Sequence, residues 1–245
     1  QILNVHLDPD ASLEFSIMLH VATVLSTIVI LWREFYPLMV SFFTVRRDKN
    51  FTMVCKILIS CIPVGIVGVF FQKDVEEFFK GNLTVVGVCL IVTAALLCFA
   101  YFTRTRQAIM HPGRSQGRDI SWLDAFIIGC AQAVAVLPGL SRSGTTIATG
   151  ILLGDRRDQV AQFSFFMVII PILGEAILDI KDMLGGEALV QASIGWLPMA
   201  VGFLASFIVG CIACKWMINL VKKGKLVWFA VYCLIVGVIC MVTGF

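Results

Sequence analysis

The sequence predicts an all-α, polytopic membrane protein with six transmembrane helices plus a re-entrant helix-loop-helix, arranged as an inverted-topology repeat. The first observation is composition: 59% of the 245 residues are hydrophobic and 14% are charged, with a mean hydropathy of +0.93. Soluble domains average about 45–50% apolar and about 25% charged residues. The second observation is that the charges separate apolar runs of membrane-spanning length. The third is one apolar region that Pro, Gly and Arg interrupt in its middle.

The same composition excludes several classes of protein. A soluble enzyme would need more charge at its surface, and a disordered chain would need fewer large apolar residues. The net charge of +3 does not indicate nucleic acid as a partner, because Lys and Arg are spread between the apolar runs and form no continuous basic face. The partner that remains is the membrane itself.

Six apolar stretches approach the length of about 20 residues that a helix needs to cross a bilayer. They are Phe15 to Trp32, Ile57 to Gln72, Gly81 to Thr103, Gln159 to Gly174, Ala188 to Cys214 and Leu226 to Phe245. The loops after the first, third and fifth stretches carry an excess of Lys and Arg, which is typical of cytoplasmic loops. The loops after the second and fourth stretches lack this excess and are predicted to lie outside.

The region from Ile120 to Leu153 does not fit a simple crossing. Pro138, Gly139 and Arg142 divide it into two pieces that are each too short to span the bilayer. Six alternating crossings require this region to enter and leave on the cytoplasmic side, so we expect a re-entrant hairpin. Irregular backbone at membrane depth is tolerated only where protein or a water-filled cavity satisfies its polar groups, and the break therefore predicts a cavity.

The hairpin and the last three crossings predict an internal repeat. Residues 120–245 would form one unit of three crossings, and residues 1–119 would form the other. Because three is an odd number, the second unit is inverted relative to the first, as in many membrane proteins with broken helices. If the two repeats are aligned crossing by crossing, the counterpart of the hairpin in the first repeat is predicted to lie upstream of Gln1.

The segment from Leu137 to Thr146 concentrates the polar chemistry of the apolar region. Pro138 and Gly139 should end the incoming half-helix, and Ser141 or Ser143 should cap a second half-helix over Thr145 to Leu153. The first amides of a capped helix and its dipole attract anions. Arg142 adds a planar fork that matches phosphate oxygens, so the segment predicts phosphate or pyrophosphate recognition.

Other readings of these polar residues remain open. Arg142 could pair with Glu175 or Asp179 and only fix the packing of helices. Gln132 could face the same cavity or bond to a neighbouring helix, and His20 could carry a proton or form a similar interhelical bond.

Gln132 together with the run Pro138-Gly139-Leu140-Ser141-Arg142-Ser143-Gly144-Thr145-Thr146 closely resembles the second signature of the undecaprenyl-pyrophosphate phosphatases, the bacitracin-resistance integral membrane type. The similarity extends to Phe15 to Leu25, to Phe163-Ser164-Phe165 with Pro171, and to Trp228 to Tyr232. It implies an enzyme of the bacterial plasma membrane, with an outward-facing cavity, that removes the terminal phosphate of a polyprenyl pyrophosphate lipid. The implied product is the monophosphate carrier of cell-wall glycans.

The resemblance also implies roles for single residues. Arg142, Ser141 and Ser143 would be catalytic, and Gly139, Gly144, Thr145, Thr146 and Gln132 would bind substrate. A divalent cation, Mg or Ca, is expected. Its ligands and the acid and nucleophile belong to a first, glutamate-rich signature that no part of Gln1 to Phe245 matches, which predicts impaired turnover. A homodimer is left open, as are two rival functions: a lipid-phosphate transporter or flippase, and a relative that only binds lipid phosphate.

Overall fold

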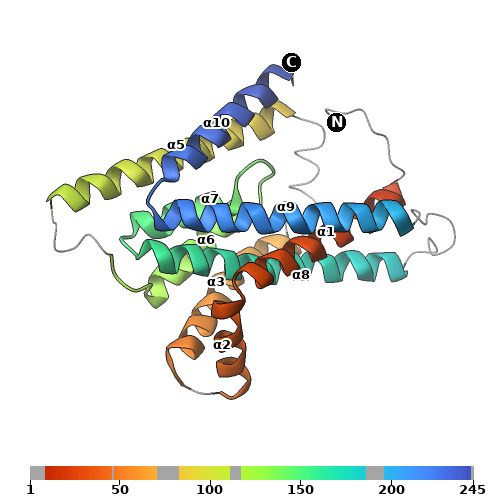
Figure 1. Cartoon of the computed structure of the whole chain (residues 1–245), viewed down its shortest axis with the longest axis horizontal. Coiled ribbons are helices and arrows are strands. Elements are labelled where there is room, and N and C mark those ends of the chain that lie inside the picture. The colour runs from red at the N-terminus through yellow and green to blue at the C-terminus, as the bar shows by residue number, and fades with distance from the viewer. Residues whose placement is uncertain (1–8, 46, 71–82, 111–116, 186–195, 244–245) are drawn as a thin grey trace. The chain divides into compact units, whose positions relative to one another are not determined.

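The structure is a computed structural model that describes residues 9–45, 47–70, 83–110, 117–185 and 196–243. Every named element in these ranges is an α-helix, which confirms the all-α prediction (Figure 1). The elements are α1 (Pro9–Ile30), α2 (Trp32–Phe43), α3 (Lys49–Phe70), α5 (Leu83–Met110), α6 (Trp122–Val134), α7 (Arg142–Leu152), α8 (Arg157–Gly185), α9 (Trp196–Lys222) and α10 (Leu226–Thr243).

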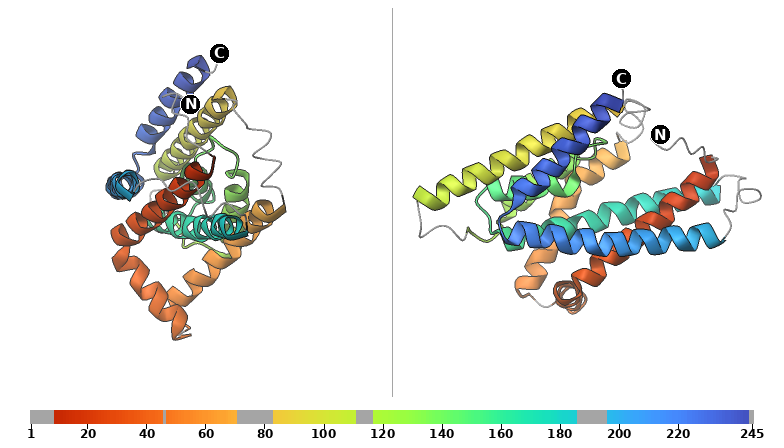
Figure 2. Two further views of the ribbon diagram at one scale, coloured as in Figure 1. Left: turned by 90° about the vertical axis from the view of Figure 1, so that its right-hand side faces the viewer. Right: turned by 45° about the horizontal axis from the view of Figure 1, so that its top comes forward.

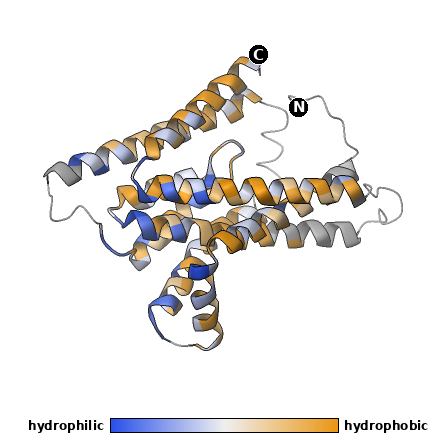
Figure 3. Cartoon of the chain, viewed as in Figure 1, coloured by the Kyte–Doolittle hydropathy of each residue, from blue (hydrophilic) through white to orange (hydrophobic). Residues whose placement is uncertain are grey.

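The described helices confirm a polytopic membrane protein. Four are long and apolar enough to cross a bilayer, namely Lys49–Phe70, Leu83–Arg106, Leu197–Lys222 and Leu226–Thr243. Figure 3 shows the hydrophobic colouring that runs along α10 and most of α9. A fifth span is the pair Ile17–Ile30 and Trp32–Phe43, if these two helices, bent by 94°, count as one. The predicted fourth crossing lies within the 29-residue helix α8, and predicted ends in 71–82, 186–195 and 244–245 lie outside the described residues.

The sequence prediction was wrong about the segment between the first two crossings, which it treated as a loop. Trp32–Phe43 forms α2, and α3 begins at Lys49, eight residues before the predicted start of the second crossing. The physical reason is a cap: Asp48 Oδ1 accepts hydrogen bonds from the Phe51 amide at 2.9 Å and from the Ser41 hydroxyl. Helix α3 therefore starts at this cap and runs past Lys56, so the charge of Lys56 does not mark the start of the helix.

The chain forms two compact units, residues 1–35 with 169–216 and residues 36–168 with 217–245. In the first unit, α1 and α9 approach closely at two glycines. A Cβ at Gly202 would lie 2.5 Å from the Phe15 ring, and a Cβ at Gly210 would lie 2.5 Å from Ser26 Oγ. Small residues allow such close helix packing in membranes. The repeat boundary at residues 119 and 120 stays a prediction.

In the second unit, α5 and α10 lie side by side (Figures 1 and 2). A Cβ at Gly87 would lie 2.7 Å from the Gly237 carbonyl oxygen, and a Cβ at Gly237 would lie 2.9 Å from the Gly87 oxygen. Helix α6 packs on α3 in the same way, because Gly129 lies directly against the Ser60 backbone. These contacts pack α10 on α5 and α6 on α3.

We expect Gly129→Ala to destabilise the protein by about 1–3 kcal/mol, since its Cβ would press on the Ser60 backbone, which cannot move without shifting α3. The matched control is Gly65→Ala on α3, where no atom lies within 4 Å of the new Cβ. That change should be neutral or stabilising, because Ala favours a helix over Gly by about 1 kcal/mol. Thermal unfolding in detergent compares the two variants, and equal midpoints would contradict this packing.

Candidate active site

Helices α6 and α7 form a hairpin whose two ends are tied together. The Arg118 amide donates to the Gly154 carbonyl at 3.0 Å, and the Arg156 amide donates to the Arg118 carbonyl at 2.9 Å. These bonds form a short parallel bridge between Arg118 and Asp155. The chain therefore begins and ends the hairpin at one place, which is the local geometry predicted for Ile120 to Leu153.

Two further contacts fix the start of the hairpin. Ser121 and Asp124 form a capping box, in which Ser121 Oγ accepts from the Asp124 amide at 3.1 Å and Asp124 Oδ2 accepts from the Ser121 amide at 2.9 Å. Lys56 on α3 donates from Nζ to the Ile120 carbonyl at 2.6 Å and lies 5.5 Å from the centre of the Trp122 ring. The long-range bond from Lys56 attaches the hairpin to α3.

Two acidic side chains share Arg118 at the hairpin base. Arg118 lies 2.7 Å from Asp124 Oδ1 and 3.5 Å from Asp155 Oδ1. The Asp155 side chain is 0% exposed. Burial, reinforced by the charge of Asp124 and opposed by that of Arg118, raises the pKa of Asp155 to about 7. Asp155 therefore gains or loses its charge near neutral pH.

Because the pKa of Asp155 is raised, the folded protein holds this proton more tightly than the unfolded chain does. Its contribution to stability is present below about pH 4 and is lost as the pH rises to about 7. We expect Asp155→Asn to remove this part of the pH dependence of the thermal midpoint between pH 5 and 8. The control is Asp119→Asn, whose side chain is 73% exposed, and a wild-type slope retained in Asp155→Asn would overturn the assignment.

The break between the half-helices is a tight turn. The Leu140 amide donates to the Leu137 carbonyl at 3.1 Å, and Gly139 has a φ of +93°. Proline followed by a positive-φ glycine at the two central positions is typical of a type II turn. A Cβ at Gly139 would lie 2.6 Å from the Val86 carbonyl oxygen of α5. Gly139 is thus required both by its dihedral angle and by the approach of α5.

The incoming half-helix ends earlier than predicted. Helix α6 ends at Val134, not at Pro138 or Gly139, and Ala135 is its C-cap. The next amides bond three residues back, Val136 to Ala133 at 3.4 Å and Leu137 to Val134 at 3.3 Å. The reason is that Pro disfavours the helical conformation of the residue before it, so the chain leaves the helix ahead of Pro138.

Ser141 is the residue that caps α7. Its Oγ accepts from the Gly144 amide at 3.1 Å, and its carbonyl accepts from the Thr145 amide at 2.8 Å. The helix therefore begins at Arg142, three residues before the predicted Thr145. The Ser141 amide donates to Thr93 Oγ1 of α5 at 3.2 Å. The Gly144 amide serves the cap, and the amides of Arg142 and Ser143 are the first two of the helix.

Several buried polar groups lie beneath the break. Helices α6, α7 and α8 meet at Gly150 of α7. A Cβ there would lie 2.7 Å from Val160 of α8 and 3.2 Å from Ile128 of α6. One turn along the same faces are three fully buried side chains, Gln132, Thr146 and Ser164. Thr146 Oγ1 donates to the Arg142 carbonyl at 2.9 Å.

Gln132 and Ser164, and also Thr145 beside Thr146, make no such side-chain hydrogen bond in the described part of the chain. Neither amide atom of Gln132, nor the hydroxyls of Ser164 and Thr145, has a hydrogen-bond partner among the described residues. Each unmade buried hydrogen bond costs about 1–3 kcal/mol, so this layer favours a polar occupant.

The structure thus brings the predicted residues together on one hairpin: Gln132, Gly139, Ser141, Arg142, Ser143, Gly144, Thr145 and Thr146. Sequence reasoning missed Thr93 and Ser164. Ser164 carried a usable signal, a lone hydroxyl between Phe163 and Phe165. The side chains of Glu175 and Asp179, the alternative partners of Arg142, lie outside the described residues. His20 Nδ1 is buried without a partner in the described ranges. This finding does not decide between a proton carrier and an interhelical hydrogen bond.

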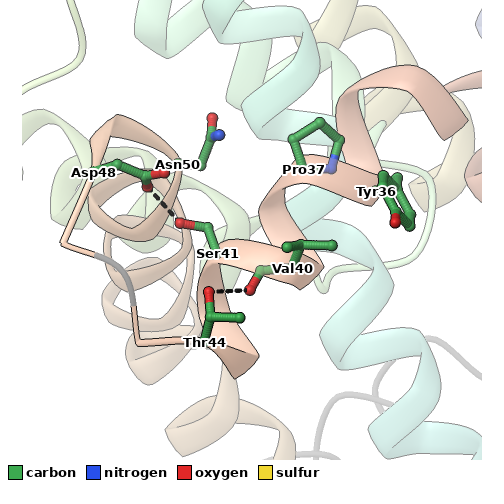
Figure 4. Close-up of a pocket in the computed structure, with 7 residues that line it drawn as sticks. All are labelled: Tyr36, Pro37, Val40, Ser41, Thr44, Asp48 and Asn50. Atoms are coloured by element: carbon green, nitrogen blue, oxygen red, sulfur yellow. Dashed lines mark hydrogen bonds between the residues drawn. The ribbon is translucent and has the colours of Figure 1, made fainter.

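A cavity of about 590 Å³ lies elsewhere, beside α2 and the start of α3 (Figure 4). It is lined by Tyr36, Pro37, Val40, Ser41, Thr44, Asp48 and Asn50. Two of its hydroxyls bond to residues near the helix ends: Ser41 donates to Asp48, and Thr44 donates to the Val40 carbonyl at 2.7 Å. The cavity holds none of the hairpin's polar residues, so we assign the chemistry to the hairpin.

No three His, Cys, Asp or Glu side chains gather as a metal site within the described ranges. The ligands of the cation expected from the resemblance therefore stay unidentified.

Comparison with known proteins agrees with the hairpin chemistry. The family model described as "Bacitracin resistance protein BacA" matches residues 1–239. A protein of Bacteroides fragilis named undecaprenyl-diphosphatase is 54% identical over 97% of this chain and 86% of its own length. Proteins of the same name from Parabacteroides distasonis and Christiangramia forsetii are 53% and 40% identical, over 95% and 97% of this chain and 84% of their own lengths. The chain belongs to the bacitracin resistance protein BacA family, as its signature segment predicted.

Proposed function

We propose that the chain is an undecaprenyl-diphosphatase, a hydrolase that removes the terminal phosphate of undecaprenyl pyrophosphate and leaves the monophosphate lipid in the membrane. The observation that carries the proposal is the broken hairpin, where Ser141 caps α7 and Arg142 is the first residue of that helix. The names of relatives up to 54% identical support the same substrate.

In this mechanism, Arg142 and the leading amides of α7 hold the diphosphate. The guanidinium fork and the helix dipole oppose the negative charge on the transferring phosphoryl group, and such positioned charges supply most of the catalysis in phosphoryl transfer. Ser141 Oγ already accepts a hydrogen bond from Gly144, so its proton remains to be donated to a phosphate oxygen. Ser143 lies next to Arg142 in the first turn and offers a second hydroxyl.

The buried layer beneath Arg142 would support this site. Gln132 can both donate and accept hydrogen bonds, and Ser164 and Thr145 each carry a hydroxyl. These groups would orient water or phosphate oxygens under the guanidinium. Gly139 and Gly144 would serve by their small size, since Val86 approaches Gly139 and the Thr93 methyl would lie 2.9 Å from a Cβ at Gly144.

The topology forms part of the proposal. Six crossings, with α8 as the fourth, place the α6–α7 hairpin as a re-entrant element in the second of two inverted repeats. Support comes from the tied hairpin base and from the basic loops that follow the first, third and fifth crossings. The cavity would open outward, as the family resemblance implies.

The divalent cation, Mg or Ca, stays a proposal from the family resemblance, as does dimerisation. Bound near the diphosphate, such a cation would neutralise charge on its oxygens. A chelator should then lower phosphate release, and Mg or Ca should restore it.

The experiment is to incubate the purified 245-residue chain with undecaprenyl pyrophosphate in detergent and to measure inorganic phosphate. The proposal predicts phosphate release above a no-protein blank. Running the Bacteroides fragilis relative beside it checks the impaired turnover predicted from the sequence. Phosphate at blank level from the chain, with an active relative, would overturn the activity proposed for the chain.

A further inference from the structure

Helix α2 leaves an apolar stripe exposed along its whole length. The exposed apolar residues follow one another at intervals of four, four and three positions, which places them on one side of the helix. They are 43% to 78% exposed, and we call them the α2 stripe: Trp32, Tyr36, Val40 and Phe43. On the other side of α2, Leu38 and Ser41 are buried. The stripe is therefore not the side by which α2 packs on the chain.

Contacts within the chain leave this stripe exposed. Trp32 and Tyr36 have partners within the chain, and 54% and 57% of these two residues still stay exposed. Tyr36 and Val40 also line the cavity of about 590 Å³ beside α2, so the apolar surface continues into a hollow (Figure 4). A large contiguous patch of exposed apolar surface marks a site of interaction. The α2 stripe thus needs an apolar environment outside the chain.

The length and the place of α2 make the bilayer interface that environment. Its 12 residues extend about 18 Å as a helix, less than the roughly 30 Å of the hydrocarbon core. Helix α3, which begins at Lys49, is long and apolar enough to cross the bilayer, and the hydrogen bond from Ser41 to Asp48 ties α2 to its start. Helix α2 therefore lies where a crossing ends, and Trp and Tyr are enriched at that level of a membrane.

Basic residues flank the stripe at both ends. Arg33, Arg47 and Lys49 are exposed. The segment from Arg33 to Lys49 holds four basic and two acidic residues. One of the two acidic residues, Asp48, already caps α3 by accepting hydrogen bonds. The excess of positive charge complements anionic lipid headgroups, which attract basic segments next to membrane helices.

We propose that α2 docks on a lipid surface, with the α2 stripe between the headgroups and the acyl chains and with Arg33, Arg47 and Lys49 on the phosphates of anionic phospholipids. Interfacial helices combine these features, since one face carries Trp and Phe and basic residues lie beside it. The basic loop after the first crossing is predicted to be cytoplasmic, so the lipids would belong to the cytoplasmic leaflet. This surface holds none of the hairpin's residues, and the proposal does not depend on hydrolysis.

The depth of Trp32 in the bilayer tests the proposal. Wild type and Trp32→Phe are reconstituted in phosphatidylglycerol vesicles that carry a fluorescence quencher at a shallow or at a deep position of the acyl chain. The difference between the two emissions isolates Trp32, and we expect the shallow quencher to act more strongly, at a depth of about 5–10 Å. The matched control is Ile62→Trp, at a residue that is 53% exposed in the middle of α3, where the deep quencher should act more strongly.

Two results would overturn the docking. Deep quenching of Trp32, equal to that of Ile62→Trp, would make α2 part of a crossing. Quenching of Trp32 by acrylamide in the water, with none by the labelled lipids, would leave the stripe in solvent. If Trp32→Phe does not fold, Val40→Trp adds a probe to the same stripe, and its added emission should show the same shallow depth.

The headgroup contacts have their own comparison. Acrylamide should reach Trp32 less in phosphatidylglycerol vesicles than in phosphatidylcholine vesicles, because the basic residues hold α2 on the anionic surface. Replacing Arg47 and Lys49 together by Gln should remove this difference. Arg156→Gln removes a charge from a side chain that is 43% exposed and pairs with Asp158, and it should keep the difference. Equal access in the two lipids for the wild type would overturn the binding of anionic headgroups.

Discussion

Phosphate release from undecaprenyl pyrophosphate is expected to fall about 100- to 1,000-fold when Arg142 is replaced by alanine. Removing one positioned donor from a site that stabilises developing charge costs about this much in other enzymes. Alanine keeps the backbone amide at the first position of α7, so the expected loss measures the charged side chain of Arg142 alone. Initial rates at saturating lipid measure the change in kcat, where a transition-state contact would appear.

Two further variants define what Arg142 contributes. Arg142→Lys keeps the charge but loses the planar fork, so we expect it to recover only part of the lost rate. Arg156→Ala removes a charge from the surface of the same unit and should keep the wild-type rate. An Arg142→Ala protein that folds normally and retains wild-type kcat would remove Arg142 from the chemistry.

Replacing Gly139 by alanine is expected to lower activity at least about tenfold, because misplacing a catalytic group by even 1 Å can cost about 100-fold. Two penalties act at this position. A side chain at a φ of +93° is strained by about 1–3 kcal/mol, and its Cβ would lie 2.6 Å from the Val86 carbonyl oxygen. The turn would have to move, and Ser141 and Arg142 would move with it.

Gly154 is the matched control for this change. It has the same φ of +93°, but nothing lies within 4 Å of a Cβ placed there. Gly154→Ala should therefore lose stability through strain while keeping most of its activity. Thermal midpoints and rates measured on both variants separate strain from displacement of the turn. Equal activities would show that the approach of α5 does not position the signature.

The sequence alone predicted the elements whose signals are local. The apolar runs predicted α5 and α10, and an arginine inside an interrupted apolar region pointed to the turn before α7. Ser141 was one of two predicted caps, because a serine before a helix is a short-range signal. Family membership followed from the same short segment.

Features that depend on long-range contacts could not be predicted. The bond from Ser141 to Thr93 joins residues 48 apart, and the bond from Lys56 to Ile120 joins residues 64 apart. No local pattern distinguishes Thr93 from any other threonine on a membrane helix. The Asp48 cap, and with it the early start of α3, was missed because charges were interpreted only as markers of loops.

If the broken hairpin of this chain takes part in hydrolysis of lipid pyrophosphate, phosphate release must depend on Arg142 and must accompany loss of the pyrophosphate lipid. The wild-type chain and Arg142→Ala are reconstituted in vesicles that contain undecaprenyl pyrophosphate, and the lipid products, the inorganic phosphate and the leaflet of the lipid are followed together. The hairpin mechanism predicts one inorganic phosphate for each undecaprenyl monophosphate formed by the wild type, and almost none from the variant. Wild-type protein that moves the pyrophosphate lipid between leaflets without releasing phosphate would contradict it and would indicate a transporter.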